Sequence, residues 1–292
     1  MATTKQVQDW WEENPFTLGL AKNKDLVGKI DLAHMDYNYF KEVERKFRKH
    51  ARGGGQEDGQ PILSKLVNYS WLKGKKALDI AVGTGFSLVA FAQAGADVTG
   101  IDLTNFAVQQ SKKNLQCRGL VGKVIQMDAQ NMTFTDETFE FVDAWGCLMH
   151  MPDTQKAINE TYRVLKPKGK FLAYMYNRDS WTFWFNFIFL RGILLLGLIR
   201  CGFNITKLTS RYTDGSIKGK GNMLTKLYTK KQATEMFKKA GYKKIKVFPW
   251  YLPDEPNHWP MRKLPLFKHL PAKWREFLGK KLAFGLIVQC EK

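Results

Sequence analysis

Cysteine is scarce in this sequence, and its positions follow no metal-binding spacing. The chain of 292 residues has four, Cys117, Cys147, Cys201 and Cys290, and no two of them form a Cys-x-x-Cys pair. A structural zinc site or a framework of disulfide bonds needs thiols that are paired in this way. The scattered positions therefore predict reduced thiols, no metal ion and a cytoplasmic protein.

Acidic residues are few relative to basic ones. The chain has 46 Lys and Arg against 27 Asp and Glu, which gives a net charge of +19. Such a surplus favours anionic partners such as nucleic acid, an acidic membrane surface or acidic metabolites, although a solubilising surface explains it equally well. From Lys218 to Lys246 the only acidic residue is Glu235, so RNA binding stays open. The interleaved basic and aromatic pattern of a known RNA-binding module is missing there.

A secretory leader is also missing from the first residues. The stretch from Met1 to Leu20 contains Asp9, Glu12 and Glu13 instead of the apolar core that a signal peptide requires. This composition adds to the expectation of a cytoplasmic location.

Long hydrophobic runs are rare, with one exception at Ser180–Arg200. Its length approaches the roughly 20 residues of a membrane span, but Arg191 lies in its middle, where a charge is costly in lipid. Strand patterns at Lys243–Trp250 and Leu282–Glu291 follow it, and a single membrane crossing would separate them from the strands before it. We therefore predict a buried or lid helix over an apolar substrate, with a helix at a membrane surface or a homodimer interface as the alternative.

The rest of the sequence is organised around Lys76–Ser87, where a short apolar strand leads into a glycine turn and a helix. Gly83 and Gly85 permit a tight turn and the close approach of a ligand, and the helix start directs free N–H groups toward it. Asp102 ends the next strand, where nucleotide-binding folds place a carboxylate for ribose hydroxyls. Leu88 replaces the third glycine of the dinucleotide fingerprint, which disfavours a pyrophosphate ligand.

The acidic residue Asp79 sharpens this prediction, because its charge suits a ligand with an amino group and a sulfonium. The pattern Asp79-x-Ala81-x-Gly83-x-Gly85 resembles motif I of the class I S-adenosylmethionine-dependent methyltransferases, with Ala81 in place of the usual glycine. The segment Tyr162–Lys170 is similar to the family's Arg-Val-Leu-Lys-Pro-Gly-Gly turn. Within the family, the chain resembles the small-molecule group that includes the ubiquinone and menaquinone methyltransferases.

The predicted elements agree with this resemblance. Strand and helix patterns alternate from residue 73 to residue 177, which is typical of a doubly wound parallel sheet. The resemblance implies an α/β, Rossmann-like fold with seven strands, of which the last is antiparallel. We expect an N-terminal helical lid (1–72), a cofactor-binding core (73–177), an inserted substrate or lid region (178–227) and a C-terminal completion of the sheet (228–292).

The resemblance also implies a site for S-adenosyl-L-methionine, which leaves as S-adenosyl-L-homocysteine after methyl transfer. The residues expected to hold it are Asp79, Ala81, Gly83, Thr84, Gly85, Asp102, Leu103, Asp128, Ala129, Trp145 and Gly146. The residues expected to line the acceptor pocket are Trp10, Trp11, Tyr37, Cys147, Tyr174 and Tyr176.

His150 is the candidate general base. It follows the fourth strand, in a loop that faces the methyl group in the family, and histidine exchanges protons near neutral pH. A histidine that only stabilises its own loop is the alternative. The predicted reaction is methyl transfer to a small apolar or amphipathic acceptor. Two other functions remain open, an RNA methyltransferase that uses residues 218–246 and a non-catalytic module that binds a membrane or a partner through residues 180–200.

Overall fold

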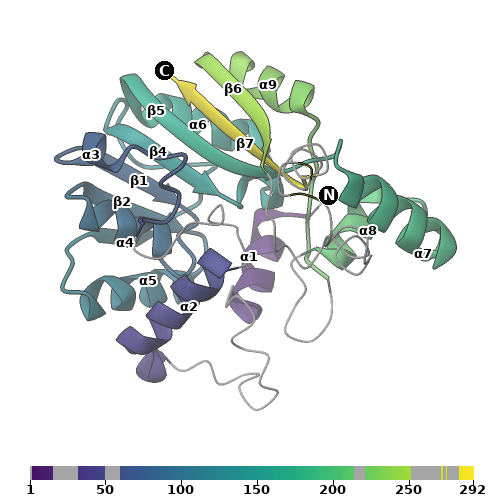
Figure 1. Ribbon diagram of the computed structural model, residues 1–292, viewed down its shortest axis with the longest axis horizontal. Coiled ribbons are helices and arrows are strands. Elements are labelled where there is room, and N and C mark those ends of the chain that lie inside the picture. The colour runs from purple at the N-terminus through teal and green to yellow at the C-terminus, as the bar shows by residue number, and fades with distance from the viewer. Residues whose placement is uncertain are drawn as a thin grey trace.

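The computed structural model describes residues 2–15, 32–49, 60–213, 221–250, 271, 274 and 283–292. Its centre is a seven-stranded sheet with the order β3-β2-β1-β4-β5-β7-β6 (Figure 1). The strands are β1 (Lys76–Ile80), β2 (Asp97–Asp102), β3 (Lys123–Gln126), β4 (Phe139–Trp145), β5 (Leu165–Tyr176), β6 (Lys243–Trp250) and β7 (Gly285–Glu291). Strands β1 to β5 pair in parallel, and β7 is antiparallel to both β5 and β6. The predicted fold class is confirmed.

Helices cover both faces of this sheet. Those on one face, α4 and α5, pack against β1, β2 and β3, whereas α6 and α9 pack on the other face against β5 and β6. Two separate apolar cores result, one on each side of the sheet. The helices are α1 (Thr4–Glu13), α2 (Tyr37–Lys49), α3 (Tyr69–Leu72), α4 (Phe86–Gln93), α5 (Asn105–Cys117), α6 (Thr154–Val164), α7 (Gly197–Arg200), α8 (Ile205–Tyr212) and α9 (Lys230–Lys239). Shorter or wider turns form the 3₁₀ helices η3 (Leu32–His34) and η4 (Leu148–His150) and the π-helix η5 (Thr182–Leu194).

Side-chain caps explain where several of these helices begin. The Thr104 hydroxyl accepts the N–H of Ala107 at the start of α5. At the start of α6 the carboxylate of Asp153 accepts the N–H of Lys156 at 2.9 Å. Each cap satisfies a backbone donor that has no partner within the helix itself.

The apolar segment 180–200 does not form one straight helix, which corrects the sequence prediction. The π-helix η5 ends at Leu194, and Leu196 takes a left-handed conformation with φ +55°. A Cβ atom on Gly197 would lie 2.3 Å from the carbonyl oxygen of Arg191, so only glycine fits there. A new short helix, α7, therefore starts at this turn. Among the described residues, no helix is both long and apolar enough to cross a membrane.

Strand β3 has only four residues, and β5 begins at Leu165, where it pairs with Phe139. Strand β7 begins at Gly285, and the predicted start at residue 282 lies outside the described residues. The lysines at 218 and 220 also lie outside them.

Candidate active site

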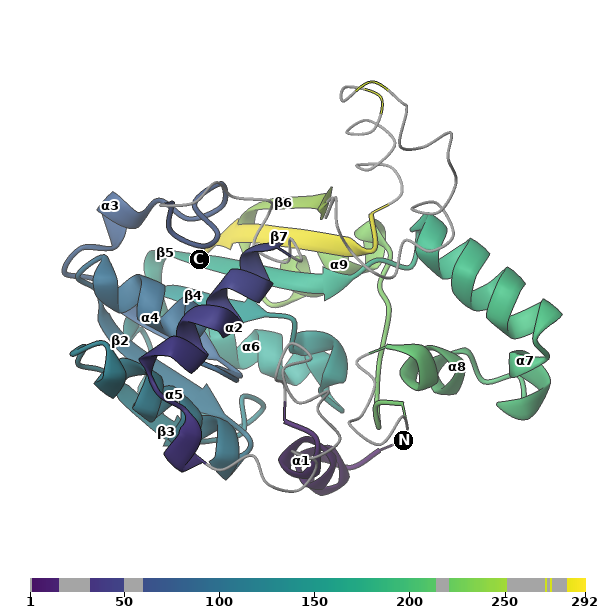
Figure 2. The same ribbon diagram turned by 60° about the horizontal axis from the view of Figure 1, so that its bottom comes forward.

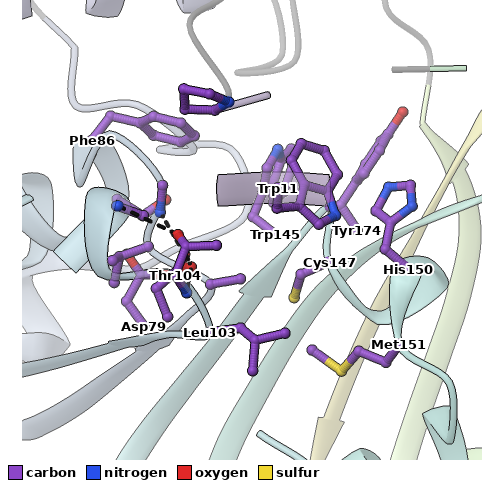
Figure 3. A pocket seen from close by; sticks show the side chains of 18 of the residues that line it. Trp11, Asp79, Phe86, Leu103, Thr104, Trp145, Cys147, His150, Met151 and Tyr174 are labelled. Carbon is purple, nitrogen blue, oxygen red and sulfur yellow. Dashed lines mark hydrogen bonds between the residues drawn. The ribbon is translucent and has the colours of Figure 1, made fainter. Parts of the chain in front are cut away.

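A cleft opens at the carboxyl ends of β1, β2, β4 and β5, where doubly wound sheets bind their ligands. It holds about 1160 Å³ of empty space, including its opening to solvent. Helix α1 lies across this opening, since Glu12 accepts the N–H of Phe106 at 3.2 Å and Trp11 meets His150 edge-to-face. Figure 3 shows two groups of side chains in the cleft, one around Asp79 and Thr104 and the other around Trp145 and His150.

The glycine turn after β1 forms the floor of the first part of the cleft. Gly83 and Gly85 have φ values of +52° and +77°, which explains why glycine is needed at both positions. Two side chains of α5 hold the turn from behind: the Ser111 hydroxyl donates to the Gly83 carbonyl at 3.0 Å, and the Asn114 amide donates to Thr84 at 2.8 Å. The turn is thereby fixed before any ligand binds.

Ala81 also has a positive φ, +57°. The left-handed region is strained for alanine because its Cβ crowds the following carbonyl oxygen. This explains physically why the family usually has glycine at this position, and why the substitution here is tolerated only at a cost in stability.

Asp102 links the end of β2 to the glycine turn. Its Oδ2 accepts the N–H of Gly83 at 3.2 Å, and its Oδ1 accepts both the N–H and the hydroxyl of Thr104 at 2.9 and 2.8 Å. Burial raises the pKa of this carboxyl, and the hydrogen bonds from Thr104 and Gly83 oppose that rise. The carboxylate is thus oriented at the wall of the cleft, as a ribose-binding residue requires.

A pair of buried carboxyl groups lies beneath the first part of the cleft. Asp79 on β1 and Asp143 on β4 are register partners in adjacent strands, so their side chains share one face of the sheet. Within the described part of the chain, Oδ2 of Asp79, both carboxylate oxygens of Asp143 and the Ser87 hydroxyl have no hydrogen-bond partner. Burial raises the pKa of Asp79 well above its usual value, and the adjacent Asp143 raises it further. Asp79 lines the cleft, whereas Asp143 lies behind it.

An unpartnered buried carboxylate oxygen at the wall of a cleft is unusual, because burying a polar atom without a partner is costly. A ligand ammonium group would supply the missing partner of Asp79. The amino acid end of S-adenosylmethionine has this group, so the residues present fit that cofactor.

Aromatic side chains form the second part of the cleft. The rings of Trp145 and Tyr174 stack at a centroid distance of 5.0 Å. Tyr176 meets His150 edge-to-face at 5.9 Å, and Trp11 meets the same imidazole at 5.5 Å. These residues come from α1, β4, β5 and η4, so the aromatic wall exists only in the folded chain.

His150 is buried and held in one orientation. Its Nδ1 lies 2.8 Å from the carbonyl oxygen of Leu224 and 3.1 Å from the amide nitrogen of Asn222. The carbonyl can only accept and the Asn222 amide nitrogen can only donate, so Nδ1 cannot bond both at once; the shorter contact favours the proton of the neutral ring on Nδ1. The lone pair of the neutral imidazole is then on Nε2.

Most of the predicted site residues come together in this cleft. Those that line it are Asp79, Ala81, Gly83, Asp102, Leu103, Trp145, Gly146, His150, Trp11, Cys147, Tyr174 and Tyr176. The others do not line it: Thr84, Gly85, Asp128, Ala129, Trp10 and Tyr37. Thr84 and Gly85 act through the shape of the turn, and Asp128 accepts hydrogen bonds from Gln130. Tyr37 is exposed and lies beneath Arg118 and Lys41.

Sequence reasoning missed several lining residues. Phe47 of α2 stacks on Phe86 at a centroid distance of 4.0 Å, and Gln110 reaches the cleft from α5. Phe86 directly follows the glycine turn, which was a usable signal. Val7 lies one helical turn before Trp11, so the spacing indicated a shared face. No local pattern marks Phe47 or Gln110.

The basic segment after residue 218 is partly engaged inside the fold. Lys226 is half-buried, and its ammonium group donates to the carbonyl oxygens of Met151 and Pro152 at 2.9 and 2.7 Å. Burial lowers its pKa. Lys244 forms an ion pair with Glu291. These two lysines stabilise the fold, whereas the sequence left open a role for them in RNA binding.

The part of the chain that forms most of this cleft is similar to a known protein family. Residues 78–173 match the family described as "Methyltransferase domain". This part of the chain is similar to a methyltransferase domain. The matched methyltransferase domain holds the glycine turn, Asp102 and the Trp145 loop, so the resemblance stated from the sequence is confirmed, and with it S-adenosylmethionine as the cofactor.

Two of the curated relatives of this part of the chain have names that refer to quinones. The demethylmenaquinone methyltransferase of Geobacillus sp. is 34% identical over 153 residues, which are 49% of this chain and 62% of that protein. The ubiquinone biosynthesis O-methyltransferase of Coxiella burnetii is 29% identical over 120 residues, which are 41% of this chain and 51% of that protein. The chain therefore spans less than two thirds of the length of these relatives.

A solved structure supports the fold of the methyltransferase domain. An S-adenosylmethionine-dependent methyltransferase from Thermotoga maritima matches 88% of this chain and 97% of its own, with a TM-score of 0.51 and 17% identity. At this identity the likeness shows the fold alone.

Proposed function

We propose that this protein transfers a methyl group from S-adenosylmethionine to a small apolar or amphipathic acceptor. The observation that carries the proposal is a single cleft with two chemically different parts. One part has bare glycine backbone and two buried carboxyl groups, Asp79 and Asp102, and the other has stacked aromatic rings. The first suits an adenosyl amino acid, and the second suits the acceptor.

The cofactor-binding part depends on residues that are already oriented. We expect Asp79 to hold the amino group, Gly83 and Gly85 to let the backbone approach, and Asp102 to hold the ribose hydroxyls. When bound, S-adenosylmethionine supplies a methyl group on a positively charged sulfur. The rate then depends largely on holding the acceptor in line with that methyl group, which a rigid pocket can do.

The acceptor-binding part is mostly apolar. Trp145, Tyr174, Tyr176 and Met151 line it, and α1 adds Trp11. Large flat side chains exclude water and favour a flat or extended apolar acceptor. The names of two relatives, a demethylmenaquinone methyltransferase and a ubiquinone biosynthesis O-methyltransferase, support a small-molecule acceptor.

His150 is the residue that we propose to accept a proton from the acceptor. The hydrogen bond from Nδ1 to Leu224 leaves the lone pair on Nε2, and the ring lines the cleft between Trp11 and Tyr176. A base is needed only for an acceptor whose nucleophilic atom carries a proton at neutral pH.

The cofactor assignment is tested by isothermal titration with S-adenosylhomocysteine. We expect saturable binding by the wild-type protein and a loss of roughly tenfold or more for Asp79→Asn, because a neutral amide no longer neutralises the ligand ammonium. Asp97→Asn is the matched control, because Asp97 lies at the start of β2, at the end away from the cleft. This variant should keep wild-type affinity. Absence of binding to the wild-type protein would contradict the proposal.

The role of His150 is tested by turnover with a panel of phenolic and quinol acceptors. If it is the base, His150→Gln lowers kcat roughly 10²- to 10⁴-fold and leaves the affinity for S-adenosylhomocysteine unchanged. The exposed His34 gives the matched control, His34→Gln. Unchanged turnover together with a lower melting temperature would show that His150 only stabilises its loop.

A further inference from the structure

A large apolar surface lies outside the cleft, on the segment that follows β5. Among the described residues, ten of the fifteen large apolar side chains that are exposed lie between residues 181 and 205. They are Trp181, Trp184, Phe189, Ile193, Leu194, Leu195, Leu196, Ile199, Phe203 and Ile205. We call this set the apolar ridge. Contiguous exposed apolar surface of this kind marks an interaction site.

The segment that carries the apolar ridge packs on the core at its start and projects from the sheet at its end. Phe183 and Phe187 of η5 are buried, and Phe187 packs edge-to-face on Phe284. Figures 1 and 2 show the helix that leads to α7 extending away from the sheet, with α7 at its far end. The exposed side chains therefore lie on a part of the described chain that projects away from the sheet.

The charge near the middle of this segment does not interrupt the ridge. The Arg191 guanidinium lies 4.3 Å from the ring centroid of Tyr212 on α8, and its Nε donates to Asn186 at 3.0 Å. Arg191 is thus turned toward α8, where its charge is balanced by a ring face and an amide oxygen.

Within residues 180–213 the charged side chains are all basic. No Asp or Glu occurs between residues 180 and 213, whereas Arg200, Lys207 and Arg211 are exposed. Trp and Phe on an apolar face beside Lys and Arg are typical of helices that lie in the interface of an anionic membrane. A second copy of the chain would bring the same positive charges together, with +19 on each copy, which opposes association through this surface.

We propose that the apolar ridge docks on an anionic lipid bilayer, with its side chains in the interfacial region and Arg200, Lys207 and Arg211 against the lipid headgroups. Docking in the interface requires no spanning helix, in keeping with the length of η5 and α7.

This docking places the cleft beside the lipid. Tyr176 lines the cleft and stacks on Phe284 at 4.5 Å, while Phe284 contacts Phe187 of η5. These aromatic contacts join the acceptor part of the cleft to the buried side of η5, the helix whose exposed side chains belong to the ridge. On the basis of the proposed function, the acceptor is a membrane-borne molecule that enters from the bilayer.

The test is flotation of the purified full chain with lipid vesicles. We expect binding to vesicles of phosphatidylcholine mixed with phosphatidylglycerol, weaker binding to phosphatidylcholine alone, and a decrease as salt is raised. The double variant Ile199→Asp/Phe203→Asp should abolish flotation. The double variant Arg200→Gln/Lys207→Gln should weaken binding to anionic vesicles roughly thirtyfold and leave binding to neutral vesicles unchanged.

The matched control is Val121→Asp, because Val121 is 91% exposed and lies far along the chain from the ridge. It should float like the wild-type protein. Failure of the wild-type chain to float with anionic vesicles would overturn the proposal, as would equal loss in the control variant. Light scattering of the same samples tests whether a second copy of the chain occupies the ridge instead. If the wild-type protein is a dimer that does not bind vesicles, and Ile199→Asp/Phe203→Asp converts it to a monomer, the ridge is a dimer interface. S-adenosylhomocysteine binding, measured in parallel, separates failure of docking from failure of the proposed function.

Discussion

The buried carboxyl of Asp143 makes a sharp prediction about stability. Its two oxygens accept no hydrogen bond of good geometry in the described part of the chain, although the Ser87 hydroxyl and the Ala144 N–H lie near them, and the carboxyl lies beside Asp79. Burial raises the pKa of Asp143 from its ordinary value of 3.8 to about 7, against smaller opposing effects of Ser87 and the Ala144 N–H. Because one pKa unit is worth about 1.36 kcal/mol, this difference of about 3 units amounts to about 4 kcal/mol.

The sign follows from proton binding. Between pH 3.8 and about 7 the folded chain holds the Asp143 proton while the unfolded chain has lost it. The free energy of unfolding therefore falls as pH rises through this range, and the full cost is present above it. Asp79 and Asp143 titrate as a pair, so the measured midpoints belong to both.

The perturbation is Asp143→Asn, which keeps the shape of the side chain and removes its charge. Its amide can also donate to the unpartnered oxygen of Asp79. At pH 8 we expect the variant to be more stable than wild type, by up to about 4 kcal/mol, and at pH 4 to differ little. Urea unfolding at the two pH values measures both differences.

Glu140 on the same strand is the control with the opposite sign. Partial burial raises the pKa of Glu140, but the hydrogen bonds from Lys166 and from the Lys76 N–H together lower it by more. The pKa of Glu140 is therefore below its ordinary value. Its contribution to stability is present above its ordinary pKa and is lost as pH falls through the lowered value. Glu140→Gln should therefore destabilise the protein at pH 8 and have little effect at low pH. An Asp143→Asn variant that is less stable than wild type at pH 8 would refute the reasoning, because the carboxylate would then have a partner.

Three further variants test the site. Gly85→Ala combines a φ of +77° with a Cβ only 3.0 Å from the Ser111 hydroxyl, so it should lose about 1–3 kcal/mol of stability and bind S-adenosylhomocysteine less tightly. Gly119→Ala, with a φ of +64° and no atom within 4 Å, isolates the conformational part of that loss in thermal melts. Asp102→Asn places an amide donor against the N–H of the glycine turn and should weaken cofactor binding roughly 10- to 100-fold by calorimetry, a loss of about 1–3 kcal/mol; unchanged affinity would remove Asp102 from the site. Lys226→Met deletes the hydrogen bonds to the loop after β4 and should cost about 1–3 kcal/mol in urea unfolding, and an unchanged midpoint would show that those contacts contribute nothing.

The sequence by itself determined the features that depend on short stretches of chain. Gly83 and Gly85 were recognisable because a turn with positive φ needs glycine, and Asp102 because it ends an apolar strand. The cap at Thr104 and the alternation of strands and helices are local in the same way. Parallel strands joined by helices then bring their carboxyl ends to one edge, which is why most of the predicted cofactor residues share one cleft.

Tertiary structure decided whatever depends on residues distant in sequence. The pairing of Asp79 with Asp143 follows from the register of β1 against β4, and Nδ1 of His150 donates to the carbonyl oxygen of Leu224 on a distant segment. Phe47 reaches the cleft because α2 packs over it. The apolar segment after β5 shows the limit most directly. Its composition fits a buried helix as well as an exposed one, and only the packing of Phe183 and Phe187, with the turn at Leu196, determines which side chains remain at the surface.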